Sequence, residues 1–313
     1  MTGIILINMG SPACRCDMKV FLNNMFNDKA ILPMPSVPRK LVAKIISTTR
    51  YKGSWDKYKL IGGSPLMKSM DEIKNALAAE IGSNYLINNA YSYSTPSVAQ
   101  AVLLQYNQGI RNLIAIPVYP QFSITTTGSV ITDLENANKQ FKDLNIKIAG
   151  SFYNEPNYIE YWTQQIKKTI AEKQLTKPHL LFSGHAIPEY LIQKGDTYVL
   201  EINESARVIS ESLGLTHDIS FQSKIGRVKW VGPDTKDKLK DLAKKNVSEI
   251  LIIPISFINE NLETLYDLDI DIVPYGRNEL GIKSLYRSNI PVNIKPLVET
   301  FKGLILKLQN ANY

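Results

Sequence analysis

The chain of 313 residues contains few residues that bind metals through sulfur or nitrogen. It has two cysteines, Cys14 and Cys16, and three histidines, His179, His185 and His217. Two thiolates cannot complete a zinc or iron–sulfur site alone, and a disulfide across a single residue is geometrically strained. We therefore expect reduced thiols in a cytoplasmic protein that lacks a sulfur-ligated metal centre.

Long apolar runs are also missing. No run approaches the ~20 residues that span a bilayer. Met1 is followed almost at once by the apolar residues 4–7, without the charged segment of a signal peptide. A hydrophobic content of 44% still provides for a folded core, and 313 residues suit two domains of about 150 residues. We predict domains at residues 1–150 and 151–313.

The formal charge of +7 is concentrated in one segment. Between Lys29 and Lys59, eight lysines and arginines stand against the single acidic residue Asp56. Residues 39–49 predict a basic amphipathic helix, which can lie on an anionic membrane, cover a cleft or form a solvated face. So local a charge argues against general affinity for nucleic acid. The apolar positions of this helix are Leu41, Val42, Ile45 and Ile46.

The two halves of the chain repeat one pattern. Short apolar runs without polar alternation are typical of strands buried on both faces of a parallel sheet. GIILINMGSP, ending at Pro12, parallels HLLFSGHAIP, ending at Pro188, and LIAIPVYP parallels LIIPISF further on. The first half is longer by about the length of the basic segment. The pattern predicts an α/β protein of two Rossmann-like, doubly wound domains, with residues near 28–67 inserted into the first.

Polar side chains follow several of these runs. In open parallel sheets, ligands bind just beyond the carboxyl ends of the strands. His185 follows residues 180–182, and its imidazole suits a metal ion or a proton near neutral pH, although a structural histidine is the alternative. After the run 249–255, an α-helix capped by Asn259 would place Glu260, Glu263 and Asp267 on one face. Such a stripe can gather divalent cations or be a solvated acidic face. The hydroxyl-rich residues 119–129 resemble either a ligand wall or a helix-capping loop.

Seven segments, in order from Leu6 to Asp271, closely resemble the ferrochelatase family, the class II chelatases that insert ferrous iron into porphyrin at the end of haem synthesis. They are LINMGSP, IGGSPL, YSYSTPS, PVYPQFSITTTGS, FSGHAIP, FQSKIGRVKWVGPDT and FINENLETLYDLDID. The resemblance implies protoporphyrin IX and Fe²⁺ as substrates, held in a cleft between the two domains, and no cofactor. An iron–sulfur cluster is not expected, because the C-terminal region has no cysteine.

The resemblance also implies roles for particular residues. His185 and Glu263 match the pair that contacts the metal and removes pyrrole protons. The acidic stripe described above makes Glu260 and Asp267 a possible auxiliary metal path. The C-terminal helix is expected to pack on the first domain, and the basic segment to bring the protein to the inner face of the cell membrane. The substrate-binding positions are Met9, Tyr51, Ser64, Tyr119, Ser123 and Trp230.

Two positions depart from the family pattern. Asn261 stands where relatives often have histidine, and Ser92 where they commonly have arginine. These departures leave open a porphyrin- or haem-binding protein with impaired insertion, and the pattern does not distinguish protoporphyrin from coproporphyrin. A hydrolase using Ser183 and His185 is disfavoured, since no nucleophile elbow is present.

Overall fold

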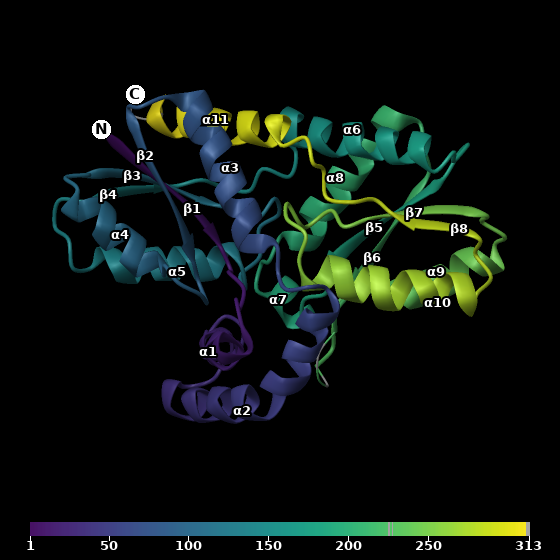
Figure 1. Ribbon diagram of the computed structural model, residues 1–313, viewed down its shortest axis with the longest axis horizontal. Coiled ribbons are helices and arrows are strands. Elements are labelled where there is room, and N and C mark those ends of the chain that lie inside the picture. Colours follow the sequence, from purple (N-terminus) through teal and green to yellow (C-terminus); the bar gives the residue numbers. More distant parts are fainter. Residues whose placement is uncertain (225, 227, 311–313) are drawn as a thin grey trace. The chain divides into compact units, whose positions relative to one another are not determined.

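The computed structural model describes residues 1–224, 226 and 228–310 (Figure 1). The chain forms two compact units. The first contains Met1–Ser151 and the C-terminal segment that begins at Val298, and the second is Phe152–Leu297.

Each unit is built on a parallel sheet of four strands with the same order. The first sheet has the order β2-β1-β3-β4 and the second β6-β5-β7-β8. The strands are β1 (Thr2–Asn8), β2 (Tyr85–Tyr91), β3 (Asn112–Pro117), β4 (Asn145–Ile148), β5 (His179–His185), β6 (His217–Gln222), β7 (Glu249–Ile253) and β8 (Ser284–Arg287). The predicted fold class is confirmed, and the repeated segments occupy equivalent strands: β1 with β5, and β3 with β7.

Helices cover both faces of each sheet (Figure 1), which is why the strand sequences are apolar without alternation. In the first unit, Ile5 and Ile7 are fully buried against helix residues such as Val102. In the second, Ile250 and Ile252 pack with Leu268 and other apolar side chains. At about 25 cal/mol per Å² of apolar area removed from water, such burial is the main stabilising term in each unit.

The helices of the first unit include a long basic one. They are α1 (Arg15–Phe26), α2 (Ser36–Leu60), α3 (Leu66–Ile81), α4 (Val98–Asn107), α5 (Thr127–Asn138) and the portion of α11 (Lys295–Asn310) from Val298 onward. The predicted helix at 39–49 is thus part of a longer one. It continues through Gly53 because Trp55 and Tyr58 stack along it, with ring centroids 6.2 Å apart, and Tyr58 is buried.

The helices of the second unit include a π-helix. They are α6 (Pro156–Glu172), α7 (Glu189–Gln193), α8 (Tyr198–Leu213), α9 (Thr235–Lys244), the π-helix η1 (Glu263–Ile272) and α10 (Val273–Asn278). We predicted an ordinary α-helix after β7, and that prediction was wrong. Pro274, at the start of α10, has no N–H to donate to a carbonyl of the preceding π-helix.

The C-terminal helix α11 is tied to the first unit by polar contacts. The Tyr85 hydroxyl donates to Gln309 Oε1 at 3.0 Å, and Lys147 Nζ donates to the Leu308 carbonyl at 2.6 Å. Lys302 forms an ion pair with Glu80 at 2.6 Å. The end of the chain therefore returns to the sheet with which it begins.

Cys14 and Cys16 form a disulfide, so the expectation of two reduced thiols was wrong. Cys14 is extended, with φ −146° and ψ 174°, and the chain enters α1 at Arg15. That change of direction places the two Cα atoms 5.3 Å apart, within the usual range for a disulfide.

Among the described residues, no helix has the length and apolar character needed to span a bilayer.

Candidate functional site

His185 is the last residue of β5 and is half-buried. Its backbone N–H donates to the Tyr198 hydroxyl at 3.0 Å, and its Nδ1 lies 2.7 Å from the Ala186 carbonyl oxygen. A carbonyl can only accept, so Nδ1 carries a proton, and the neutral form of the ring with this tautomer has its lone pair on Nε2. The contact between Ala186 and Nδ1 thus prepares Nε2 to take a proton or to ligate a metal.

Gly184 allows this arrangement. A Cβ at that position would lie 2.7 Å from Ile202 Cδ1 and 3.1 Å from the Tyr198 hydroxyl oxygen. The tyrosine can approach the strand only because residue 184 has no side chain. Burial raises the pKa of Tyr198, and its hydroxyl in turn donates to Ser256 Oγ at 2.8 Å. Tyr198 is therefore a neutral, fixed support for the end of β5.

Gln222 links the His185 end of the sheet to the π-helix that carries Glu263. It is the last residue of β6, pairs with His185 in the parallel ladder and is only 1% exposed. Its carbonyl accepts from the Ala186 N–H at 2.8 Å, and its side-chain Nε2 donates to the Glu263 carbonyl at 3.0 Å. One buried residue thus connects the backbone beside His185 with that of Glu263. No sequence signal had pointed to Gln222.

The predicted acidic stripe does not form as one face. The Ser223 hydroxyl, just after β6, donates to the Asp267 carboxylate. The Glu260 carboxylate is bound instead to Arg287 at the end of β8, with distances of 3.0 and 3.1 Å. Because β6 and β8 are opposite edges of the sheet, Glu260 and Asp267 contact opposite sides. The α-helical spacing behind the prediction fails because Glu260 precedes η1, and because hydrogen bonds in a π-helix join residues five apart.

Asn261 has a structural role at the start of the η1 segment. Its side-chain oxygen accepts from the Thr264 N–H at 3.0 Å, and the Thr264 hydroxyl accepts from the Asn261 N–H at 3.0 Å. This reciprocal pair satisfies backbone donors at the helix start, the function that we had assigned to Asn259. The residue that replaces the family's histidine is therefore a helix cap.

Trp230 lies on a segment that pairs with the residues following His185. It bridges Pro188, and the Val231 N–H donates to the Ile187 carbonyl at 2.9 Å. Its ring is half-buried, and the buried Nε1–H has no acceptor within the part of the chain that the structure describes. Of the predicted substrate-binding residues, Trp230 is the one within the unit of His185 and Glu263.

Met9 and Tyr119 occupy the corresponding ends of the first sheet. Met9 follows β1, as His185 ends β5, and its carbonyl accepts from the Tyr93 N–H at 3.0 Å. Tyr119 follows β3, the neighbour of β1. The strands β2 and β3 lie on opposite sides of β1, so the strand order changes direction at β1. The crevice at such a switch point is the usual ligand-binding position of an open α/β sheet. The structure thus places both predicted residues at that edge.

The other three predicted positions in the first unit are more dispersed. Tyr51 lies on α2 under the Arg15 guanidinium, 5.7 Å from its ring centroid. Ser64 precedes α3, where its hydroxyl accepts from the Leu66 N–H at 3.4 Å. Ser123 is 1% exposed, and its hydroxyl accepts from the Thr125 N–H at 3.2 Å in the turn before α5. That local bond is the geometry of a loop preceding a helix.

A half-buried acidic group in the first unit, Asp133, was missed from the sequence. Asp133 on α5 lines a cavity of about 490 Å³ together with Ser92, the residue that departs from the family pattern. Burial, with a smaller contribution from the Asp28 charge, raises the Asp133 pKa to about 6, although the Ser92 hydroxyl works in the opposite direction. Nothing in the local sequence distinguished this aspartate from a surface residue of an amphipathic helix.

The fold is that of the chelatases. The chain resembles the solved structure of SirB from Bacillus subtilis with Fe3+, with a TM-score of 0.61 and 10% identity, covering 99% of this chain and 96% of that one.

The sequence specifies the family more narrowly. The ferrochelatase family model matches residues 1–307. The ferrochelatase of Aquifex aeolicus is 37% identical over 271 residues, which cover 85% of this chain and 86% of that protein. The ferrochelatase of Rippkaea orientalis is 36% identical over 320 residues, covering 97% and 82%. The chain belongs to the ferrochelatase family and is an enzyme that inserts iron into porphyrin in haem biosynthesis.

Proposed function

We propose that this ferrochelatase inserts Fe²⁺ into protoporphyrin IX, with His185 and Glu263 handling the protons and the metal. Insertion must remove two pyrrole protons while the hydrated cation loses water. A neutral imidazole and a carboxylate suit these two tasks. Ferrous iron is the substrate, and the reaction as proposed requires no resident cofactor.

The observation that carries the proposal is the linkage through Gln222. Its 3.0 Å hydrogen bond to the Glu263 carbonyl joins the two proposed residues at one end of one sheet. The tautomer set by Ala186 leaves His185 Nε2 able to accept a pyrrole proton. Trp230, on the segment paired with residues 187–189, offers an aromatic wall for a flat macrocycle.

Asp267 is the better candidate for an auxiliary position on the metal path, and Glu260 is not retained for that role. The Glu260 carboxylate accepts from Arg287, from the Thr264 hydroxyl at 2.6 Å and from the Ile290 N–H at 3.0 Å. Freeing it would leave the charge of Arg287 partly unpaired. Asp267 has an exchangeable hydroxyl partner in Ser223, which a hydrated cation can displace.

Two substitutions test the assignment of His185 and Glu263. Glu263→Gln and His185→Ala should each lower iron insertion to below about a tenth of wild-type turnover, with porphyrin binding, followed by fluorescence quenching, still measurable. His217→Ala is the matched control, because His217 begins β6 at the opposite end of the sheet. If either variant keeps more than that turnover, or the control loses as much, the assigned roles are wrong.

The choice of porphyrin has its own test. The purified enzyme is given Fe²⁺ with protoporphyrin IX or with coproporphyrin, and initial rates are compared at matched porphyrin concentrations. A faster rate with coproporphyrin would overturn protoporphyrin as the substrate while leaving the family and the two residue roles intact.

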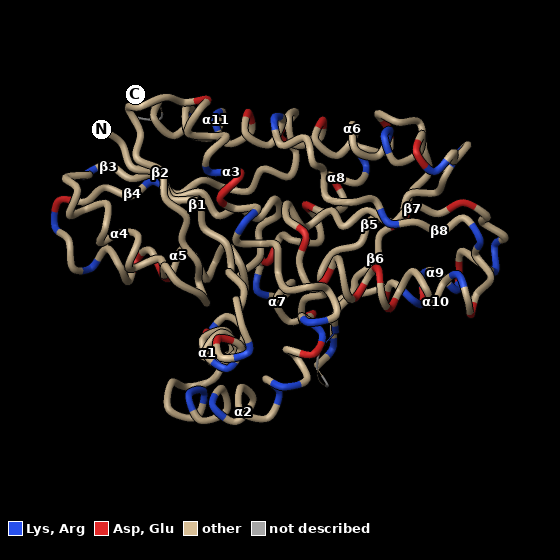
Figure 2. The backbone as a smooth tube through the Cα atoms, in the orientation of Figure 1, with Lys and Arg blue, Asp and Glu red and all other residues tan. Residues whose placement is uncertain are grey.

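The basic helix α2 is proposed to associate with the anionic inner face of the cell membrane, which would place the enzyme in the cytoplasm. Figure 2 shows lysines and arginines along α2. Leu41 and Ile45 are 61% and 53% exposed, whereas the other two apolar positions, Val42 and Ile46, are half-buried. The exposed pair, with Lys40 and Lys44 beside it, is suited to an anionic lipid surface.

Vesicle co-sedimentation tests this docking. Each lysine near an anionic surface contributes about 1 kcal/mol, and salt screens it. Lys40→Glu with Lys44→Glu should abolish binding to phosphatidylserine vesicles at low salt. Arg39 is left unchanged, because it donates to the Asn27 and Met34 carbonyls and so positions the segment that precedes α2. Binding that ignores both salt and charge reversal would reject the proposal.

A further inference from the structure

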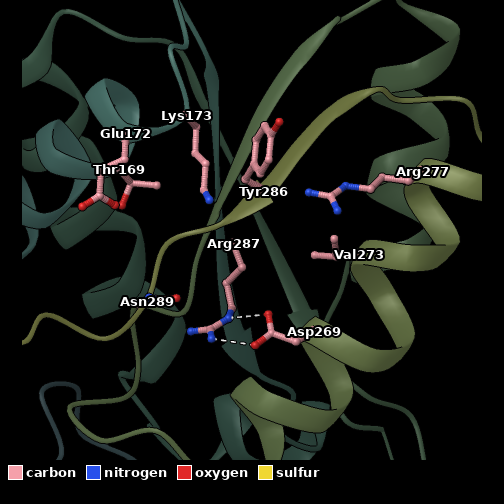
Figure 3. Close-up of a pocket in the computed structure, with 9 residues that line it drawn as sticks. All are labelled: Thr169, Glu172, Lys173, Asp269, Val273, Arg277, Tyr286, Arg287 and Asn289. Atoms are coloured by element: carbon pink, nitrogen blue, oxygen red, sulfur yellow. Dashed lines mark hydrogen bonds and ion pairs between the residues drawn. The ribbon is translucent and has the colours of Figure 1, made fainter.

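A second, unassigned cavity lies within the second unit, at the β8 edge of its sheet (Figure 3). Its volume is about 260 Å³, and its walls come from α6, η1, α10 and β8. Since Gln222 and Ser223 contact Glu263 and Asp267 from the β6 edge, this cavity is on the side of the sheet away from those contacts. It is therefore separate from the proposed insertion chemistry.

Two exposed cations at this cavity have no acidic partner. The Lys173 Nζ lies 5.5 Å and the Arg277 guanidinium carbon 4.8 Å from the ring centroid of Tyr286. Figure 3 shows the two side chains on either side of that ring. Arg277 donates through Nε to the Leu285 carbonyl, at 2.8 Å. Within the described residues, neither cation forms a salt bridge with a carboxylate.

Arg287 forms the floor of the cavity, and its side chain is only 4% exposed. Its Nε and Nη2 donate to the Asp269 carboxylate at 2.7 Å each, and Nη1 donates to Glu260 and to the Ser288 carbonyl. A guanidinium has five N–H donors, so one Nη2 proton has no acceptor among the described residues. A buried charged group with an unused donor, lining a cavity, indicates that an acceptor belongs there.

The carboxylates of the cavity do not cancel this positive character. Asp269 is committed to Arg287, and Glu172 lies 3.8 Å from Lys168, one turn earlier on α6. Lys173 and Arg277 remain as two positive charges on either side of the Tyr286 ring. Arg287 adds the Nη2 proton that no described residue accepts. This arrangement offers N–H donors from three cationic side chains to the oxygen atoms of a ligand.

We propose that this cavity binds a small polyanion, whose carboxylate or phosphate groups are held by Lys173 and Arg277 beside Tyr286. Two separated cations favour a ligand with at least two anionic groups over a single-charge ion. The volume of about 260 Å³ is below the range of about 300–1,000 Å³ typical of drug-sized ligands, which favours a ligand smaller than a nucleotide. Diphosphate and a short di- or tricarboxylate fit both the size and the charge.

The binding experiment uses the full chain, free of iron and porphyrin, with sodium pyrophosphate and sodium citrate as separate probes in isothermal titration calorimetry. Sodium chloride at matched ionic strength is the control for screening. Saturable binding of one probe identifies phosphate or carboxylate as the preferred chemistry. If neither probe binds at millimolar concentration in low salt, the proposal is overturned.

Variants then locate the site. Lys173→Gln and Arg277→Gln should each weaken binding about tenfold, and the double variant about 100-fold, because each loses charge-assisted hydrogen bonds. Both side chains are exposed, so folding, checked by circular dichroism, should be unchanged. The matched control combines Lys167→Gln and Lys245→Gln, which removes the same charge at exposed positions outside the cavity. Equal losses in the control and the cavity double variant, or no loss in the latter, would place the binding elsewhere.

Discussion

Gln222 should control the position of Glu263, and replacing it should reduce both stability and turnover. In Gln222→Leu two buried hydrogen bonds disappear: the one from the Ser183 hydroxyl, at 2.9 Å, and the one to the Glu263 carbonyl, at 3.0 Å. The Ser183 hydroxyl keeps Thr235 as a partner at 3.2 Å. These two lost hydrogen bonds together predict a decrease of about 2 kcal/mol in the free energy of unfolding.

The loss of turnover separates positioning from general destabilisation. Ser183→Ala removes the hydroxyl contacts with Gln222 and Thr235 but keeps the bond from Gln222 to the Glu263 carbonyl. It is the matched control, with an expected cost of about 1–2 kcal/mol and turnover close to wild type. Gln222→Leu should lower the turnover of iron insertion at least about tenfold, because small displacements of a reacting group are costly. Urea denaturation and insertion rates at a temperature where both variants are folded provide the comparison. Equal turnover in the two variants would refute the positioning role of Gln222.

Three further predictions follow from buried polar groups. Arg287→Leu should lower the free energy of unfolding by about 3 kcal/mol, measured in urea, because Glu260 and Asp269 lose a buried partner; a loss below about 1 kcal/mol would contradict it. Asn261→Ala should cost about 1 kcal/mol through the lost helix cap, while Asn261→Asp retains the acceptor and the stability; equal effects would reject the capping role. Because the raised pKa of Asp133 favours its neutral form, its contribution is full below pH 4 and lost as pH rises through about 6. Asp133→Asn should therefore gain about 1 kcal/mol relative to wild type between pH 4 and 7, after allowance for partial exposure, and an unchanged difference would exclude this titration.

The sequence predicted the sheets well because their signals are local. Strands such as Ile4–Ile7 and Leu180–Phe182 are apolar on both faces, and only a parallel sheet covered by helices on both sides uses such runs. The repeated segments predicted equivalent strands, and the common order of the two sheets confirms them. Strand ends then indicated His185 and the segment that contains Tyr119, since the carboxyl edge of an open sheet follows from chain direction alone. Met9 was predicted from the family resemblance.

Side-chain partners could not be predicted, because they depend on residues distant in the chain. Glu260 was grouped with Glu263 on a helical face, yet Arg287, twenty-seven residues later, binds its carboxylate. Asn261 carries no signal that separates a cap from a site residue until Thr264 is seen to return the bond. The predicted roles of His185 and Glu263 remain predictions until the variants are measured.

The sequence by itself determined the family, the parallel α/β class and the strand ends at which chemistry can occur, because these follow from residue order and from patterns a few residues long. Tertiary structure alone decided the π-helical winding of Glu263–Ile272, the link through Gln222 and the opposite contacts of Glu260 and Asp267. Each of these depends on which strand edge lies beside a given turn of helix. That neighbour is set by packing between residues far apart in the chain, which no local pattern encodes.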